Sequence, residues 1–171
     1  MKIFIKGSVL LAITIFVLNA CGNSSFKEEV KLTKSSVQSA FDEKDKERNQ
    51  TINKVNFYLP FGYEIKEKTA NNMILKNGSK TYILFYNPLE NSKSEVVYKA
   101  SINQHKNLDV NKTFKKGNKL GFLLIERLKN DMCEVTVGVG GAKLTTETRS
   151  SNMASEAKEM MEMAKSVKAK K

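Results

Sequence analysis

The sequence predicts an α+β fold: a single domain with a mainly antiparallel sheet of two hairpins packed by two helices, after an N-terminal leader and a charged helical stalk. Three patterns predict this class. Asn77-Gly78 stands between two apolar runs, residues 129–131 separate two more, and an apolar repeat at intervals of three and four follows residue 151. About 150 residues remain after the leader, which suffices for one domain with one core.

The first hairpin is predicted over residues 73–86. Asn-Gly between two apolar runs favours a type I′ turn, because both residues tolerate the positive φ that this turn needs. The second strand, residues 79–86, is apolar at both odd and even positions, so we expect it to be central and covered on both faces. An earlier strand over residues 55–59 ends at Pro60 and Gly62, and a short strand can resume beyond them.

The second hairpin is predicted from residues 120–128 and 132–139, which flank a polar turn. The glycine-rich residues 138–143 lack the spacing of a phosphate-binding loop. We therefore expect these glycines to permit a bulge or a close backbone approach at a strand end. The polar stretch that follows, residues 145–149, is assigned no strand.

A helix is predicted from Ser92 to about Gln104. Ser92 and Glu95 have the spacing of a capping box, in which the serine accepts a backbone amide and the glutamate reaches back. The run over residues 96–98 also suits a strand.

A closing helix is predicted after Ser151 or Asn152, either of which can cap it. Its apolar face is expected to cover the sheet. That face consists of Met153, Ala154, Ala157, Met160, Met161, Ala164 and Val167.

Residues 1–20 have the order of a secretory signal peptide. Lys2 and Lys6 give a positive start, residues 8–17 are almost entirely apolar, and Leu-Asn-Ala directly precedes Cys21. The alternative is a transmembrane anchor, but the apolar run is shorter than the roughly 20 residues that a spanning helix needs.

This segment resembles the lipobox of bacterial lipoproteins. The resemblance implies cleavage before Cys21, a diacylglycerol thioether on its sulfur and, as an open option, a fatty acid such as palmitate on its amine. Two or more acyl chains hold a protein stably on a bilayer. We therefore expect a lipid-anchored protein on the extracytoplasmic side of the cell membrane, with its folded part in water.

The chain divides by composition into the signal peptide, residues 1–20, a lipidated tether with a charged stalk, residues 21–50, and a globular α+β domain, residues 51–171. The stalk has a thin apolar stripe, so it is predicted to be a partly ordered helix that forms mainly if it docks. The alternative is a solvated charged linker. The stripe consists of Phe26, Val30, Val37 and Phe41.

The net charge of +11 falls to +9 when Lys2 and Lys6 leave with the leader, and this excess favours anionic partners. Lysines scattered over loops do not indicate a nucleic-acid site. For an extracytoplasmic lipoprotein the expected partners are the membrane, another envelope protein or an anionic cell-wall polymer. The expected contact surface is a basic loop, which can include a short edge strand, and its alternative is a loop that only aids solubility. Its lysines are Lys112, Lys115, Lys116 and Lys119.

With Cys21 assigned to lipid, Cys133 is left alone, which excludes an internal disulfide and a metal site of several cysteines. Cys133 lies in an apolar alternation and is expected to be buried. We expect no cofactor, no metal and no enzymatic activity, because the sequence contains no paired nucleophile and base. The alternative is a surface-attached hydrolase or thiol enzyme using His105 with Cys133 or a carboxylate.

The order of elements resembles a class of small Gram-positive lipoproteins of unknown function, through the LPFGY turn at residues 59–63, the NGSKTYILF hairpin, the EVTVGVGG strand and the closing helix. It is also similar to the α/β sandwich of the PsbP and Mog1 group. This second resemblance implies a scaffold of varied binding roles. Neither resemblance transfers catalytic residues.

Overall fold

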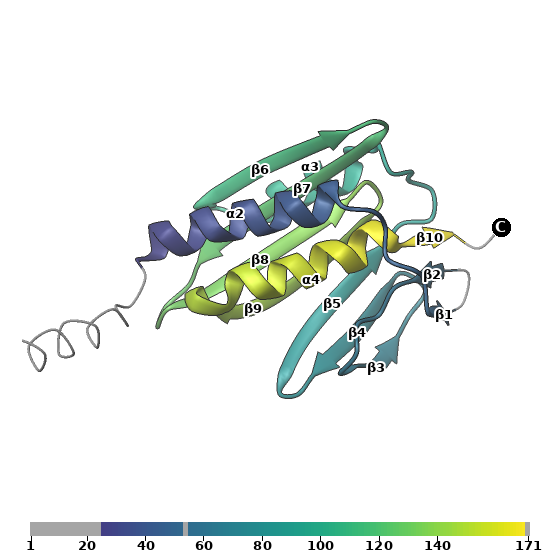
Figure 1. Cartoon of the computed structure of the whole chain (residues 1–171), viewed down its shortest axis with the longest axis horizontal. Coiled ribbons are helices and arrows are strands. Elements are labelled where there is room, and N and C mark those ends of the chain that lie inside the picture. Colours follow the sequence, from purple (N-terminus) through teal and green to yellow (C-terminus); the bar gives the residue numbers. More distant parts are fainter. Residues whose placement is uncertain (1–24, 53–54, 170–171) are drawn as a thin grey trace, which may run out of the picture.

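The computed structural model describes residues 25–52 and 55–169 of the 171-residue chain (Figure 1). The predicted signal peptide and Cys21 lie outside the described residues.

A seven-stranded antiparallel sheet forms the centre of the fold, with the strand order β3-β4-β5-β9-β8-β7-β6 (Figure 1). A second, three-stranded sheet has the order β1-β2-β10. The strands of the large sheet are β3 (Tyr63–Lys68), β4 (Asn72–Asn77), β5 (Lys80–Tyr86), β6 (Val110–Lys116), β7 (Lys119–Arg127), β8 (Met132–Val139) and β9 (Ala142–Arg149). Those of the small sheet are β1 (Gln50–Ile52), β2 (Val55–Phe57) and β10 (Lys168–Ala169). The α+β class with a mainly antiparallel sheet is thus confirmed.

Both predicted hairpins are present, and the first has a different turn from the one expected. Asn77 pairs with Lys80, so the two loop residues are Gly78 and Ser79. Only Gly78 has positive φ (59°), whereas a type I′ turn needs positive φ at both positions. The predicted type I′ turn is therefore wrong.

The turn of the second predicted hairpin, between β7 and β8, contains Asn130 and Asp131, which have φ of 57° and 59°. These two residue types tolerate the left-handed region better than most.

Two further hairpins were not predicted. The lysine-rich segment forms a full edge strand, β6, which turns at Gly117-Asn118 and pairs with β7 along its length. The polar residues 145–149 belong to β9, which turns from β8 at Gly140-Gly141 and inserts between β8 and β5. Threonine is β-branched and fits a pleated strand, so β9 forms although its composition is polar.

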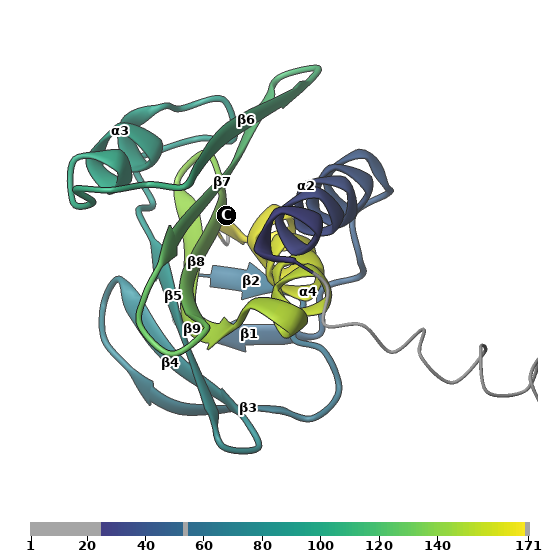
Figure 2. The same cartoon turned by 90° about the vertical axis from the view of Figure 1, so that its left-hand side faces the viewer.

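One face of the large sheet is covered by α2 (Phe26–Asp42) and α4 (Met153–Ser166), which pack against each other (Figure 2). Val37, Ala40 and Phe41 of α2 are buried in the same core as the methionines of α4. Gly121 of β7 lies so close to Phe41 that a Cβ would be 2.7 Å from the ring. The thin apolar stripe of the charged segment is therefore a docking face, and the solvated-linker alternative is excluded for residues 26–42.

The opposite face carries α3 (Val96–Ile102), whose Val97 packs on Phe122 and Leu124 of β7 (Figure 2). The helix begins at Val96, later than predicted, and Ser92 does not cap it. The cap residue is Glu95 without a side-chain bond, and Ser94 Oγ accepts from the backbone amide of Val96.

Strand β5 is not covered on both faces as predicted. Tyr82, Leu84 and Tyr86 are buried against the helices, but Ile83 on the other face is 47 % exposed. The reason is that α3 is only seven residues long and leaves the β5 and β9 side of this face open.

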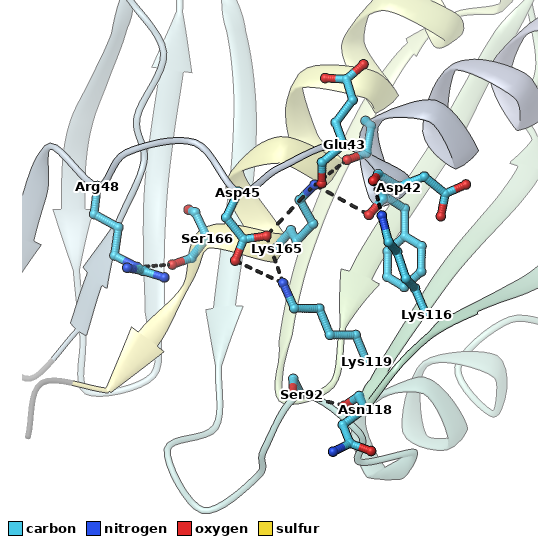
Figure 3. Close-up of polar contacts among 12 residues, drawn as sticks. Asp42, Glu43, Asp45, Arg48, Ser92, Lys116, Asn118, Lys119, Lys165 and Ser166 are labelled. Atoms are coloured by element: carbon cyan, nitrogen blue, oxygen red, sulfur yellow. Dashed lines mark hydrogen bonds and ion pairs between the residues drawn. The ribbon is translucent and has the colours of Figure 1, made fainter.

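Lys165 of α4 holds the end of α2 in place (Figure 3). Its side-chain ammonium donates to the carbonyl oxygens of Ala40 (2.5 Å), Phe41 (3.4 Å) and Glu43 (2.7 Å), where the helix leaves acceptors unpaired. Lys165 is 4 % exposed, and burial lowers the pKa of its amine, with Asp45 opposing this shift. A buried cation at a helix C-terminus also interacts favourably with the helix dipole.

Two lysines of the β6–β7 hairpin strengthen this connection. Lys119 Nζ lies 2.7 and 2.9 Å from the two oxygens of Asp45, and Lys116 Nζ donates to the carbonyl of Asp42. We name the connection formed by Lys165, Lys116 and Lys119 with residues 40–45 the α2 clasp (Figure 3).

Replacing Lys165 with methionine should lower the free energy of unfolding by about 2–3 kcal/mol, because buried carbonyls lose their donor while the side-chain volume is kept. Urea unfolding followed by circular dichroism measures this. Lys34→Met, on the exposed side of α2, is the matched control and should change stability by less than about 0.5 kcal/mol. An equally small effect of Lys165→Met would show that the clasp does not hold α2.

Candidate functional site

The open face of the sheet contains a groove beside α3, which we name the α3 groove. Its volume is about 800 Å³. A second hollow of about 650 Å³ continues it along β9 toward Arg149 and shares Ile83, Glu134 and Thr145 with it. The residues lining the α3 groove are Asn72, Ile83, Phe85, Val97, Ala100, Gln104, His105, Glu126, Leu128, Glu134, Thr136, Lys143 and Thr145.

A histidine and two glutamates form one end of the groove. His105 Nδ1 lies 2.8 Å from Glu126 Oε2, and His105 Nε2 lies 3.5 Å from Glu134 Oε1. The strand register places Glu126 opposite Glu134, and Glu134 opposite Glu147. Like charges directly opposite each other destabilise a sheet, and the two ring nitrogens of His105 each lie near one of these carboxylates.

A partly buried amine lies at the other end. Lys143 Nζ donates to Ser101 Oγ (3.1 Å) and to Gln104 Oε1 (3.3 Å), both from the α3 segment. Burial lowers the pKa of the Lys143 amine, and the Glu134 carboxylate acts in the opposite direction. The amine thus connects β9 to the α3 segment at the edge of the groove.

The floor between these ends combines hydroxyl groups with apolar surface. The hydroxyls of Thr136 and Thr145 lie 2.8 Å apart, and either can donate to the other. Ile83 and Phe85 supply the apolar part. A carboxylate end, an amine end and a floor of mixed polarity can bind a chain that presents both charged groups and apolar groups.

Cys133 and His105 are not brought together. Side chains alternate along β8, so Cys133 points into the core beneath α2 and α4, whereas Glu134 points to the opposite face and meets His105. Cys133 is fully buried, and burial raises the pKa of its thiol. A buried thiol without a histidine beside it has the features of a packing residue.

The four predicted contact lysines do not form one patch. Lys112 and Lys116 lie on the face of β6 that also carries the core residue Phe114, while Lys115 lies on the other face. Lys119 and Lys116 belong to the α2 clasp. Lys112 and Lys115 are exposed, and Cys21 lies outside the described residues.

Sequence reasoning missed Glu126, Glu134 and Lys143 as a set. A weak signal was present, since each is a charged residue within an otherwise apolar or β-branched run. Their proximity depends on the pairing of β7, β8 and β9 and on the position of His105 after α3.

No protein-family model matches the sequence, and the curated proteins contain no significant match to it. Within residues 25–52 and 55–169, no group of three or more histidine, cysteine, aspartate and glutamate side chains is arranged to hold a metal ion. Across the same described part of the chain, no helix combines the length and apolar character that crossing a membrane requires.

Cys133 should resist thiol reagents in the folded protein, because its sulfur is buried and its pKa is raised by that burial. Alkylation at neutral pH, followed by peptide mass mapping, should be at least about tenfold slower in buffer than in urea. Rapid native alkylation of Cys133 would contradict a packing role and favour the thiol-enzyme hypothesis.

Proposed function

We propose that the chain is a lipid-anchored, extracytoplasmic, non-enzymatic binding protein whose partner is another envelope protein or an anionic surface polymer. The lipobox before Cys21 supports the anchor. Only three residues separate Cys21 from Ser25, where the side chains of Ser25 and Glu28 form the capping box that starts α2. The folded part thus begins close to the proposed lipid, and the anchor localises the protein to the cell membrane.

The observation that carries the binding role is the α3 groove. Its charged ends and its mixed floor fit a polypeptide segment better than a uniformly charged polymer, so an envelope protein is the partner class that the groove favours. An anionic polymer is instead suited by the exposed Lys112 and Lys115. The two partner classes therefore point to different surfaces.

The alternative is a surface-attached hydrolase or thiol enzyme using His105 with Cys133 or a carboxylate. The burial of Cys133 weighs against the thiol form. The contacts of His105 with Glu126 and Glu134 keep a carboxylate form open, although these three side chains also serve as structural contacts between the sheet and the segment after α3. The binding role is the simpler account of the groove.

Cys21→Ala should move the protein from the membrane fraction to the soluble fraction or block its maturation, and it should abolish labelling with radioactive palmitate, because the thioether has no sulfur to form on. Cell fractionation and autoradiography measure this. Cys133→Ala is the matched control and should keep both membrane association and label. Persistent membrane association together with palmitate label in Cys21→Ala would contradict the anchor.

Ile83→Arg, which places a long cation in the α3 groove, should reduce recovery of a crosslinked envelope partner at least about tenfold. Phe61→Arg, at an exposed apolar position outside the groove, is the matched control and should leave recovery unchanged. Quantitative mass spectrometry of crosslinked complexes measures both.

A double variant separates the polymer from the protein partner. The variant Lys112→Ser with Lys115→Ser leaves the α2 clasp unchanged. If the polymer is the partner, this variant should bind purified anionic wall polymer more weakly than the unchanged protein does. The difference should disappear at high salt, because salt screens the interaction of the lysines with the polymer. Unchanged binding in both this variant and Ile83→Arg, with the fold intact, would refute the proposed binding surfaces.

A further inference from the structure

We propose that the outer side of α2 lies on the anionic surface of the membrane that holds the lipid anchor, with Lys27, Lys31 and Lys34 against the head groups. This inference rests on the proposed lipidation of Cys21. It adds an orientation to the anchored domain and assigns a partner, an anionic phospholipid surface, to a helix face that the binding role does not use.

The spacing of the three lysines places them on one stripe of the helix. Residues four and three positions apart are neighbours on a helical surface, so Lys27, Lys31 and Lys34 form a continuous row. All three are exposed. The buried stripe of α2, which includes Val37 and Phe41, faces the sheet and α4, and the lysine row lies beside this stripe on the solvent-exposed part of the helix.

The row is also close to the proposed lipid. The four residue steps from Cys21 to Ser25 span at most about 14 Å. The capping box at Ser25 starts the helix there without any further linker. A helix of 17 residues is about 26 Å long, so a helix lying along the bilayer places the whole lysine row within one Debye length, about 8–10 Å, of the head groups.

The other side chains of this face agree with a lipid surface. Leu32 follows Lys31 in sequence, lies on a neighbouring part of the exposed surface of α2 and is 53 % exposed, which suits contact with the boundary between head groups and acyl chains. The Arg127 guanidinium stacks 3.5 Å from the ring centre of Phe26 and adds a cation at the anchored end. Of the three acidic residues of α2, Glu29 is buried, the exposed Glu28 accepts from the Ser25 amide in the capping box, and the exposed Asp42 accepts from Gln38 about two turns beyond Lys34.

The orientation has a consequence for the α3 groove. α2 and α3 lie on opposite faces of the sheet (Figure 2). With α2 against the bilayer, the groove points away from the membrane, where an envelope partner can reach it.

Lysine footprinting on vesicles tests the proposal with the lipidated full chain. Vesicles of pure phosphatidylcholine are compared with vesicles of equal parts phosphatidylglycerol and phosphatidylcholine, and acylation of each lysine is measured by peptide mass spectrometry. Labelling of Lys27, Lys31 and Lys34 should fall at least threefold on the anionic vesicles and recover at high salt. Lys93, in the loop before α3, and Lys99 of α3 are exposed lysines outside α2 and are the internal controls, which should not change.

A spin label gives a second readout. Leu32→Cys supplies a reactive thiol in a lipidated chain whose Cys133 is buried, and Val96→Cys is a matched control because Val96 of α3 is also 53 % exposed. A nitroxide at position 32 should be broadened by a nickel-chelating lipid on anionic vesicles, and replacing Lys27, Lys31 and Lys34 with serine should abolish this broadening. A nitroxide at position 96 should not respond.

The outcomes separate the two proposals. If the protein floats with the vesicles but its α2 lysines label equally on both lipids, the anchor stands and the orientation is refuted. Protection of Lys93 and Lys99 in place of the α2 lysines would also refute it. If the purified chain does not float with either vesicle and carries no lipid by mass, the proposed anchor itself fails.

Discussion

The ammonium of Lys165, inserted against the end of α2, is the contact on which the arrangement of the domain depends. α2 has no basic residue in its own last turn, so its final carbonyls need donors from elsewhere. Lys165 supplies them from α4, and Lys116 and Lys119 supply further contacts from the β6–β7 hairpin. The first and the last α-helix of the described residues, α2 and α4, thus meet an edge of the sheet at one place. Desolvating the amine has a cost, seen in its lowered pKa, and the three carbonyl bonds offset it.

The parts of the fold that local sequence could predict are those with local causes. The Asn77-Gly78 and Asn130-Asp131 sequence pairs and the apolar repeat of α4 are short-range signals, and each led to the right hairpin or helix, although the first turn is formed by Gly78 and Ser79. β9 was missed because its threonines read as a loop, while its pairing with β5 and β8 depends on strands distant in sequence. The docking of α2 was uncertain for the same reason, since its stabilising partner, Lys165, comes more than 120 residues later.

The candidate site was less predictable than the fold. The acidic row of Glu126, Glu134 and Glu147 exists only once three strands are in register, and no single segment of sequence contains it. Conversely, the lysines of residues 112–119 form a run in the sequence, but the alternation of the strand and the β6–β7 turn divide them. The lysines are close in sequence but do not form one surface, whereas the acidic residues are distant in sequence but lie side by side. Both results arise because strand pairing and the pleat decide where side chains in a sheet point.

The two outermost strands of the large sheet, β3 and β6, leave backbone donors and acceptors available to another strand. A protein fixed in the plane of a membrane meets its neighbours at high local concentration, which favours the joining of sheets edge to edge. Both strands oppose such joining. β3 alternates charges of both signs and shifts register between Ile65 and Glu67, and β6 carries three lysines. The lysines that suggest an anionic partner would therefore also keep molecules anchored to one membrane from aggregating with one another.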